Sequence, residues 1–323
     1  MNIIAIIWTH NPEIWLLRIV IKQALKNLRK IIVIDNKSAN VHEIEKILLS
    51  FPQDKVKFVK LPKNLGVHAL NIGLQLALQE WPDYILFLDD DSILFDNAIK
   101  SINEYLKGLS SKLLDRIAII SIIDFDHIPK LLKRYIENNS NHWGKLIVHS
   151  LPIAFSGSIL NTKIILKENI NIRKNLFLHG ADTELYKRVG KKGYLIAWYA
   201  NHLMRHRSGI PLTRPLNFLG IEINYIVTPK SYYYIIRNCT ILLLEKTISI
   251  LDWLYVILSF FSILFLKDSS RKLFVKFAIL GFSHGLFKKE GYFDLDRLTL
   301  KSEYRYSIND IHHKDTSMCN NYV

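Results

Sequence analysis

The chain has 323 residues, of which 49% are hydrophobic and 22% are charged, and its formal net charge is +14. This composition is close to the globular average, which excludes wholesale disorder and fibrous repeats, and the length predicts one large domain or two ordinary ones. The basic excess predicts an anionic partner, such as nucleic acid, a phosphorylated substrate or an acidic membrane face. Cys239 and Cys319 are too few for a disulfide framework or a cysteine zinc cluster, which fits a reducing compartment.

Short β-branched runs alternate with amphipathic segments along the first 120 residues. The expected strands are Ile3–Trp8, Lys30–Asp35, Val56–Lys60, Tyr84–Asp89 and Ile117–Ile120. The expected helices are Glu13–Asn27, Val41–Ser50, Val67–Trp81 and Asn97–Lys107. This alternation predicts an α/β fold whose mostly parallel sheet is covered on both faces. Since open α/β sheets bind ligands where their strands end, the residues after each strand are the first functional candidates.

The first run, from Asn2 to Trp8, has no basic region before it and no small-residue cleavage site after it. We therefore expect a buried first strand and no secretory signal. Later in the chain, ordered segments are expected at Leu151–Leu160, Leu176–Arg188 and Gly193–Trp198, with loops and a helix between Ser121 and Leu151.

Three consecutive carboxylates follow the apolar run Ile85–Leu88: Asp89, Asp90 and Asp91. Adjacent carboxylates repel one another, and the end of a buried strand cannot hold them without compensation. A divalent cation such as Mg²⁺ or Mn²⁺ is the simplest compensation, because it shares its shell between protein carboxylates and substrate phosphates. The alternative is a solvated acidic turn, which fits poorly in a chain of net charge +14.

Six short motifs follow one another along the chain. They are Thr9-His-Asn-Pro12, Val33-Ile-Asp-Asn36, Asn64-Leu-Gly66, Leu88-Asp-Asp-Asp-Ser92, Ser156-Gly-Ser158 and Asp182-Thr-Glu-Leu-Tyr-Lys-Arg188. In this order they resemble family 2 glycosyltransferases, and most of all the rhamnosyltransferase-like branch that assembles bacterial surface polysaccharides. The resemblance covers roughly residues 3 to 210, and more loosely Tyr232–Asn238 and Gly281–Gly291. It implies a GT-A fold, which is a single nucleotide-binding α/β domain.

The resemblance also implies which residues bind the nucleotide and the donor sugar. These are Thr9, Asp35, Asn64, Gly66, Asp89, Asp90, Ser156, Gly157 and Arg188. Within this set Asp35 would accept a hydrogen bond from the pyrimidine imide, while Thr9 and Asn64 would frame the nucleotide. Ser156 to Ser158 would line the donor sugar. The Asp-x-Asp motif would hold the ribose and the metal-bound diphosphate.

The same resemblance assigns the metal and the catalytic base. Asp89, Asp91 and His206 would hold Mg²⁺ or Mn²⁺, and Asp182 matches the aspartate that acts as base. A helix N-terminus is the expected setting of Asp182, and since its dipole lowers a carboxylate pKa, another neighbour is needed to keep the base strong. A plain helix cap at Asp182 and a surface-loop histidine at position 206 are the alternatives. The chain departs from the family pattern at Ala181, where relatives often have Glu, and at His10, where an aromatic residue is usual.

The C-terminal third is basic and apolar. Ile248–Leu266 is 19 residues long with one charge, at Asp252, and could cross a bilayer by length alone. A span would place the catalytic domain on the side opposite its basic tail, away from a cytoplasmic donor. An interfacial helix on an anionic membrane, or a helical hairpin against the core, avoids this conflict, and we expect the interfacial helix. An ordinary buried helix is the alternative. The predicted divisions are residues 1–215 for the catalytic domain, 216–300 for a helical region and 301–323 for a polar tail.

The leading hypothesis is an inverting, metal-dependent glycosyltransferase that uses a nucleotide-diphosphate sugar, with rhamnose as the family-level guess. Its acceptor would be a growing, lipid-linked O-antigen or capsule glycan at the cytoplasmic face of the bacterial inner membrane. A nucleotidyltransferase is one alternative, although Trp8–Pro12 lacks the glycine-rich basic loop typical of that class. A non-enzymatic nucleic-acid-binding protein is the other. The basic residues lie largely beside apolar helices instead of forming a stripe with aromatics, so we expect no nucleic acid.

Overall fold

The computed structural model describes residues 1–123, 145–148, 154–206, 210–218, 221–226, 228–263 and 271–298. Its centre is an eight-stranded sheet. In spatial order the strands are β3 (Val56–Lys60), β2 (Lys30–Asp35), β1 (Ile3–Thr9), β4 (Tyr84–Asp89), β8 (Ser158–Asn161), β6 (Ile117–Ile123), β9 (Leu195–His202) and β7 (Leu146–Val148). Strands β3, β2, β1 and β4 are parallel, as are β6 and β9, which confirms the predicted α/β fold with a mostly parallel sheet.

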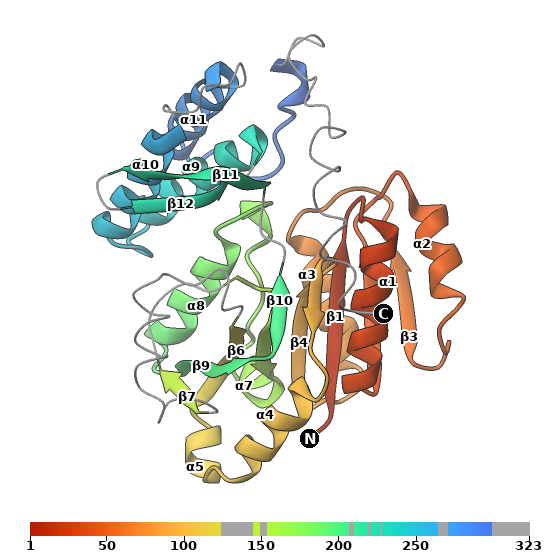
Figure 1. Ribbon diagram of the computed structural model, residues 1–323. Coiled ribbons are helices and arrows are strands. Elements are labelled where there is room, and N and C mark those ends of the chain that lie inside the picture. Colours follow the sequence, from red (N-terminus) through yellow and green to blue (C-terminus); the bar gives the residue numbers. More distant parts are fainter. Residues whose placement is uncertain are drawn as a thin grey trace.

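Helices cover both faces of this sheet (Figure 1). One face carries α1 (Ile14–Asn27), α2 (Val41–Leu48) and α4 (Ala98–Lys107), and the other carries α3 (His68–Leu78), α7 (Thr162–Lys167) and α8 (Ala181–Lys191). Strand β1 shows why both faces must be covered. Its Ala5 and Ile7 belong to one buried core, while Ile4 and Ile6 belong to the other. Side chains alternate across a strand, so a continuous apolar run needs helices on both sides.

The helix signals are equally direct. In α1, the buried residues Leu17, Val20, Ile21 and Ala24 recur at the spacing of one helical face. The first four predicted helices form within three residues of their expected bounds. A short helix α5 (Ser111–Leu114) precedes β6, and two 3₁₀ turns, η2 (Lys174–Leu176) and η3 (Asp296–Leu298), occur later.

The second half of the sheet departs from a simple parallel order. Strand β8 lies antiparallel between β4 and β6, and β7 is antiparallel to β9. The ordered segment expected over Leu151–Leu160 contains the start of β8 at Ser158, and residues 151–153 lie outside the described part of the chain. Most of the region expected as loops and a helix between Ser121 and Leu151 also lies outside it, as does the predicted tail 301–323.

The C-terminal region adds a hairpin and three helices above the edge where β1 and β4 end (Figure 1). The hairpin joins β11 (Ile210–Phe218) to β12 (Ile221–Ile226), and the helices are α9 (Pro229–Leu244), α10 (Ile250–Ile263) and α11 (Arg271–Leu286). Helix α9 starts where the Thr228 hydroxyl accepts a hydrogen bond from the Ser231 amide, with Pro229 in the first turn. The domain boundary expected near residue 215 falls inside β11, and the three-part division remains a prediction.

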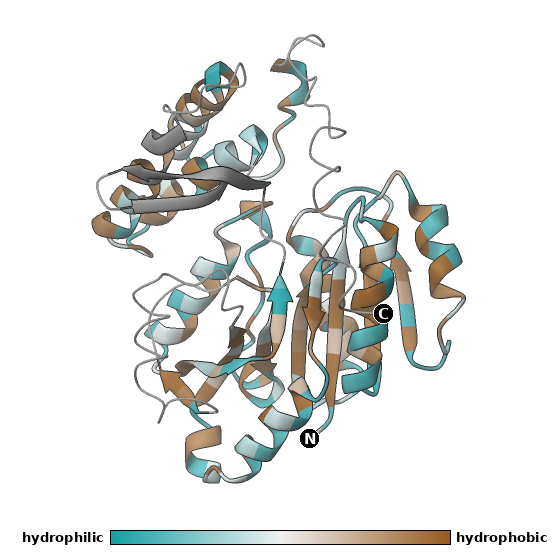
Figure 2. Cartoon of the chain, in the orientation of Figure 1, coloured by the Kyte–Doolittle hydropathy of each residue, from teal (hydrophilic) through white to brown (hydrophobic). Residues whose placement is uncertain are grey.

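The apolar run Ile248–Leu266 forms α10, which has 14 residues within the described part of the chain. None of the helices described here is long and apolar enough to cross a membrane. Hydropathy colouring shows brown segments along the C-terminal helices as well as through the central sheet (Figure 2).

Candidate active site

The carboxylates after β4 face a histidine from much later in the chain. Strand β5 (Ser92–Leu94) pairs with β10 (Met204–His206), and this pairing sets Ser92 opposite His206. His206 Nδ1 lies 3.1 Å from Asp91 Oδ1, and His206 Nε2 lies 3.9 Å from Asp89 Oδ2. One ligand atom from each of these three residues falls within 4.8 Å of the others, as a shared cation requires. The predicted trio is thus brought together, and His206 lies on a strand instead of a surface loop.

Nearby protein groups compensate the negative charges of this acidic cluster only in part. Burial raises the pKa of Asp89 to about 7. The charge of His206 opposes this rise, and the charges of Asp91, Asp90 and Asp182 add to it. Burial likewise raises the pKa of Asp90 to about 6, against the hydrogen bond that the Thr9 hydroxyl donates to it over 2.7 Å. Asp91 Oδ1 is buried and accepts no hydrogen bond among the described residues. An orphaned carboxylate oxygen beside another carboxylate and an imidazole fits a divalent cation.

The residues predicted to hold the nucleotide surround the ends of β1 and β2. Both carboxylate oxygens of Asp35 accept from the Ser38 amide at 3.2 Å, and the Asp35 side chain is buried. The Ser38 hydroxyl in turn accepts from the Asn11 amide. Asp35 is therefore held rigidly at the end of β2, while its predicted contact with a pyrimidine remains a prediction.

Asn36 is a site residue to which the sequence assigned no role. Its side-chain nitrogen donates to Asn64 Oδ1 at 3.0 Å and to the Gly66 carbonyl, and its oxygen accepts from the Leu65 amide at 2.8 Å. These bonds tie the end of β2 to the loop before α3, so Asn36 fixes the predicted nucleotide residues Asn64 and Gly66. Its position directly after Asp35 in a polar strand end was the available signal.

Ser156 and Gly157 lie beside the acidic cluster. The Ser156 hydroxyl accepts from the Asp89 amide at 3.0 Å and is 2.6 Å from the Ser92 hydroxyl, which reaches His206 Nδ1 at 2.7 Å. Gly157 has φ +84°, and its amide donates to the Phe87 carbonyl. Ser158 instead points into the interior, where its hydroxyl donates to the Ala154 carbonyl. Ser156 and Ser92 thus orient two cation ligands, whereas the structure gives Ser158 an interior role.

Asp182 occupies the first turn of α8, as predicted, and accepts from the Thr183 amide at 2.7 Å. The sequence predicts that the helix dipole lowers this pKa and that another neighbour keeps the base strong. Burial raises the pKa of Asp182, and the opposing backbone hydrogen bonds do not cancel that effect. Because burial makes a carboxylate a stronger base, the partial burial of Asp182 acts in the direction that the sequence expected of a neighbour. Its influence on the pKa of Asp89 shows that the two carboxylates share one electrostatic environment.

Arg188 lies further along α8. Its guanidinium donates to Glu184 at 2.7 Å and 3.1 Å and to the Asn171 carbonyl at 2.6 Å. These bonds anchor α8 to the preceding segment. The structure therefore shows Arg188 supporting the helix that carries Asp182, and its contact with the donor remains a prediction.

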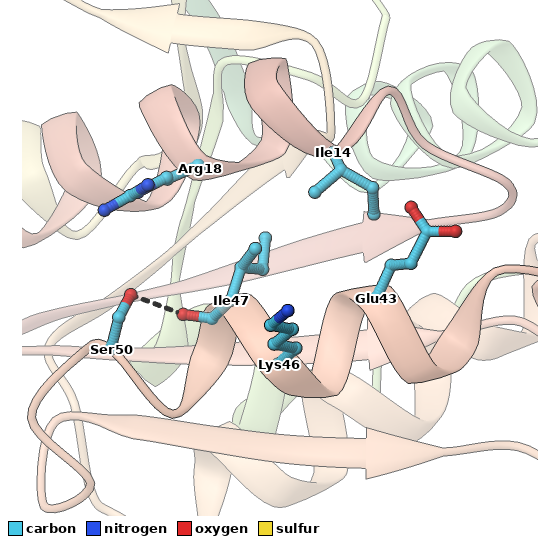
Figure 3. Close-up of a pocket in the computed structure, with 6 residues that line it drawn as sticks. All are labelled: Ile14, Arg18, Glu43, Lys46, Ile47 and Ser50. Atoms are coloured by element: carbon cyan, nitrogen blue, oxygen red, sulfur yellow. Dashed lines mark hydrogen bonds between the residues drawn. The ribbon is translucent and has the colours of Figure 1, made fainter.

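A separate hollow lies between α1 and α2 (Figure 3). Its lining residues are Ile14, Arg18, Glu43, Lys46, Ile47 and Ser50. None of the predicted site residues lines this hollow. The candidate active site therefore lies at the strand ends, away from it.

Comparison with known proteins agrees with this geometry. Residues 5–121 match the glycosyl transferase family 2. Over 255 residues the chain is 26% identical to the dTDP-rhamnosyl transferase RfbF of Shigella flexneri, which covers 77% of this chain and 82% of that relative. Residues 5–121 therefore carry a family 2 glycosyltransferase domain. This assignment to a nucleotide-sugar-dependent enzyme class favours the leading hypothesis over the nucleotidyltransferase and the nucleic-acid-binding protein.

Solved structures share the fold of this glycosyltransferase. A crystal structure of GalNAc-T7 with UDP, GalNAc and Mn²⁺ superimposes with a TM-score of 0.53 at 13% identity, covering 89% of this chain and 56% of that one. Residues 1–349 of S. aureus TarS in complex with UDP-GlcNAc give a TM-score of 0.50 at 15% identity, covering 86% and 79%. Both likenesses concern the α/β fold, which confirms the GT-A expectation.

Proposed function

We propose that this glycosyltransferase transfers rhamnose from a thymidine-diphosphate donor to a hydroxyl of a growing, lipid-linked bacterial surface glycan, with inversion at the sugar carbon. The observation that carries the proposal is the convergence of Asp89, Asp91 and His206 at one end of the sheet that also holds Asp182. The sugar and nucleotide follow from the name of the Shigella flexneri relative. The lipid-linked acceptor follows from the resemblance to enzymes of surface polysaccharide assembly.

The residues after β4 would hold the donor diphosphate. In this proposal Asp89, Asp91 and His206 bind Mg²⁺ or Mn²⁺, which neutralises the negative charge of the leaving diphosphate. Thr9 keeps Asp90 oriented through its hydroxyl hydrogen bond, and Asn36 keeps the Asn64–Gly66 loop in place beside the nucleotide. The chain thereby presents a rigid cradle in which the bond from sugar to phosphate is exposed to attack.

Asp182 would act as the general base. Its carboxylate takes the proton of the acceptor hydroxyl, and the resulting oxygen attacks the sugar carbon from the side opposite the phosphate. The bond to the phosphate oxygen breaks, and its electron pair leaves with the nucleoside diphosphate. Burial, which raises the pKa of Asp182, favours the proton transfer. A positioned base of this kind contributes about 10²–10⁴-fold to the rate.

The test is a donor panel assayed by release of nucleoside diphosphate. The full chain is incubated with thymidine-diphosphate rhamnose, UDP-GlcNAc or GDP-mannose, with Mn²⁺, with Mg²⁺ or with a chelator. The proposal expects turnover with the rhamnose donor, loss of turnover with the chelator, and a product whose glycosidic bond has the opposite anomeric configuration by NMR. Retention of configuration would contradict the assigned role of Asp182, and turnover only with another donor would contradict the assigned sugar.

We also propose that the C-terminal helices rest on the cytoplasmic face of the bacterial inner membrane. Apolar side chains of α10 and the end of α11 are exposed, among them Leu251, Tyr255, Ile279 and Phe287. Exposed basic residues accompany them: Arg271, Lys272, Lys276, Lys288 and Lys289. Each basic residue close to an anionic leaflet contributes about 1 kcal/mol, which salt screens, whereas apolar burial is insensitive to salt.

Flotation with vesicles tests this membrane proposal. The protein should float with anionic vesicles at low salt, and high salt should weaken that binding without abolishing it. Leu251→Asp combined with Phe287→Asp should release it. Trp81→Asp, at an equally exposed apolar residue of the catalytic domain, is the matched control and should leave binding unchanged. Absence from anionic vesicles at low salt would contradict a membrane-facing surface.

A further inference from the structure

Helix α9 buries a charged side chain and an amide side chain next to each other, Arg237 and Asn238. Arg237 and Asn238 are both fully inaccessible to solvent. Every nitrogen of the Arg237 guanidinium has a partner: Nε donates to Asn238 Oδ1, Nη1 to the Gly291 carbonyl and Nη2 to the Leu176 carbonyl, at 2.9, 2.7 and 3.0 Å. The rings of Tyr233 and Tyr234 flank the guanidinium. Burying a charge and an amide is costly unless hydrogen bonds compensate both groups.

Those bonds hold the backbone of the segment Leu176–Gly180. The Asn238 side-chain nitrogen donates to the carbonyls of Leu176, Leu178 and His179 at 2.8, 2.7 and 2.8 Å. The bond from Arg237 Nε to Asn238 Oδ1 fixes which end of the amide faces these carbonyls, because only its oxygen can accept. A single amide thus gathers the carbonyl at the end of η2 and two carbonyls of the turn between η2 and α8.

The segment is one that needs such support. Phe177, His179 and Gly180 all have positive φ, of +58°, +60° and +75°. Two of the three are not glycine, and such residues persist in this conformation only where the surroundings enforce it. Two successive side chains of this segment are also anchored in different cores. Leu176 packs in the core against the sheet, and Phe177 packs with α9 and α11.

The same segment connects directly to both halves of the active site. On one side the Phe177 carbonyl accepts from the Val67 amide at 2.7 Å, next to Gly66 of the nucleotide loop. On the other side Gly180 is the N-cap of α8, two residues before Asp182. The nucleotide loop has its own support from Asn36, whereas the start of α8 depends on the turn that Asn238 holds.

We infer that Arg237 and Asn238 are positioning residues that set the place of the Asp182 carboxylate by fixing the backbone turn before α8. This inference rests on the proposed role of Asp182 as base. It gives the C-terminal region a part in catalysis without contact with substrate. Helix α11 backs the arrangement, since Gly285 packs against the Arg237 carbonyl, where a Cβ would come within 2.8 Å.

The test uses Asn238→Asp, which keeps size but replaces the donor nitrogen with an acceptor oxygen. Because a displacement on the order of 1 Å at a reacting group can cost about 10²-fold, we expect kcat to fall about ten- to hundredfold. The donor KM should stay within about threefold, since the Asn36 network still holds the nucleotide loop. Thr240→Ala is the matched control: this buried α9 side chain bonds the Ile236 carbonyl and Trp253 but not the turn, so kcat should be preserved.

A second measurement does not depend on turnover. Amide hydrogen exchange over residues 174–186 should quicken in Asn238→Asp and not in Thr240→Ala. Arg237→Lys, which loses the bond to Asn238 Oδ1 but keeps the charge, should give an intermediate result in both assays and guards against a misfolded aspartate variant. Unchanged exchange in both variants, or faster exchange with unchanged kcat, would overturn the inference. Absence of transfer in the parent chain with every donor would instead refute the proposed function, while the exchange experiment would still decide whether the turn is held by α9.

Discussion

Replacing Gly66 with alanine should destabilise the protein by more than the backbone cost of the substitution. Gly66 has φ +56°, where an alanine costs about 1–2 kcal/mol relative to its preferred conformations. A Cβ at this position would also overlap the Phe177 carbonyl oxygen and lie 2.7 Å from Phe177 Cδ2. Overpacking of this kind adds about 1–3 kcal/mol. The expected loss of unfolding free energy is therefore about 2–5 kcal/mol.

Gly193 provides the matched control. It has φ +84°, and a Cβ there would meet no atom within 4 Å. Gly193→Ala should then show only the backbone cost of about 1–2 kcal/mol, and urea unfolding of both variants by circular dichroism gives the difference. Since Gly66 belongs to the nucleotide loop, Gly66→Ala should also weaken binding of nucleoside diphosphate, measured by calorimetry, and Gly193→Ala should not. Equal destabilisation by the two substitutions would refute the steric argument.

Three further predictions concern the chemistry. Asp91→Ala should abolish Mn²⁺-dependent binding of nucleoside diphosphate in calorimetry while the circular dichroism spectrum stays unchanged; retained Mn²⁺-dependent affinity would remove Asp91 from the cation site. Asp182→Asn should lower kcat by about 10²–10⁴-fold with little change in donor affinity, and near-normal turnover would leave Asp182 a first-turn helix residue with no part in catalysis. Burial raises the pKa of Asp89 to about 7, so the stability that its protonated form contributes to the folded state is lost as pH rises through that value. Below that pH a cation must displace the proton from Asp89 in order to bind. The rise in Tm caused by Mn²⁺ should therefore be small near pH 5 and large near pH 8, and equal shifts at both would contradict this reading.

The first half of the fold was predictable because its signals are local. Strands β1, β2 and β4 each contain a continuous apolar run, and the helices between the strands show a buried face at the helical period, as in Leu17, Val20, Ile21 and Ala24 of α1. The antiparallel insertion of β8 between β4 and β6 was not predictable in this way. Strand direction depends on how the chain returns to the sheet, and a run of four residues such as Ser158–Asn161 carries no sign of it.

The carboxylates of the candidate cation site were predictable from their adjacency, whereas His206 was predicted only through the family resemblance. Asp89 to Asp91 are adjacent, whereas His206 joins them through the pairing of two three-residue strands, β5 and β10. The polar residues that hold the loops were harder to recognise, because Asn36 and Asn238 act mostly on backbone carbonyls and amides. One visible sign existed in α9, where Tyr233, Arg237 and Ile241 share a buried helical face with a charge at its centre.

The pairing of β5 with β10 also has a consequence for biosynthesis. Ser92 and His206 are 114 residues apart in the sequence, so the ribosome synthesises Asp89 and Asp91 well before His206. A nascent chain that ends within the segment matching the family, at residue 121, already carries Asp89 and Asp91 but lacks the third ligand. Long-range pairing of this kind forms late, after the closure of a large loop. At the proposed cation site, the third ligand is therefore in place only after β10 has been synthesised and has paired with β5.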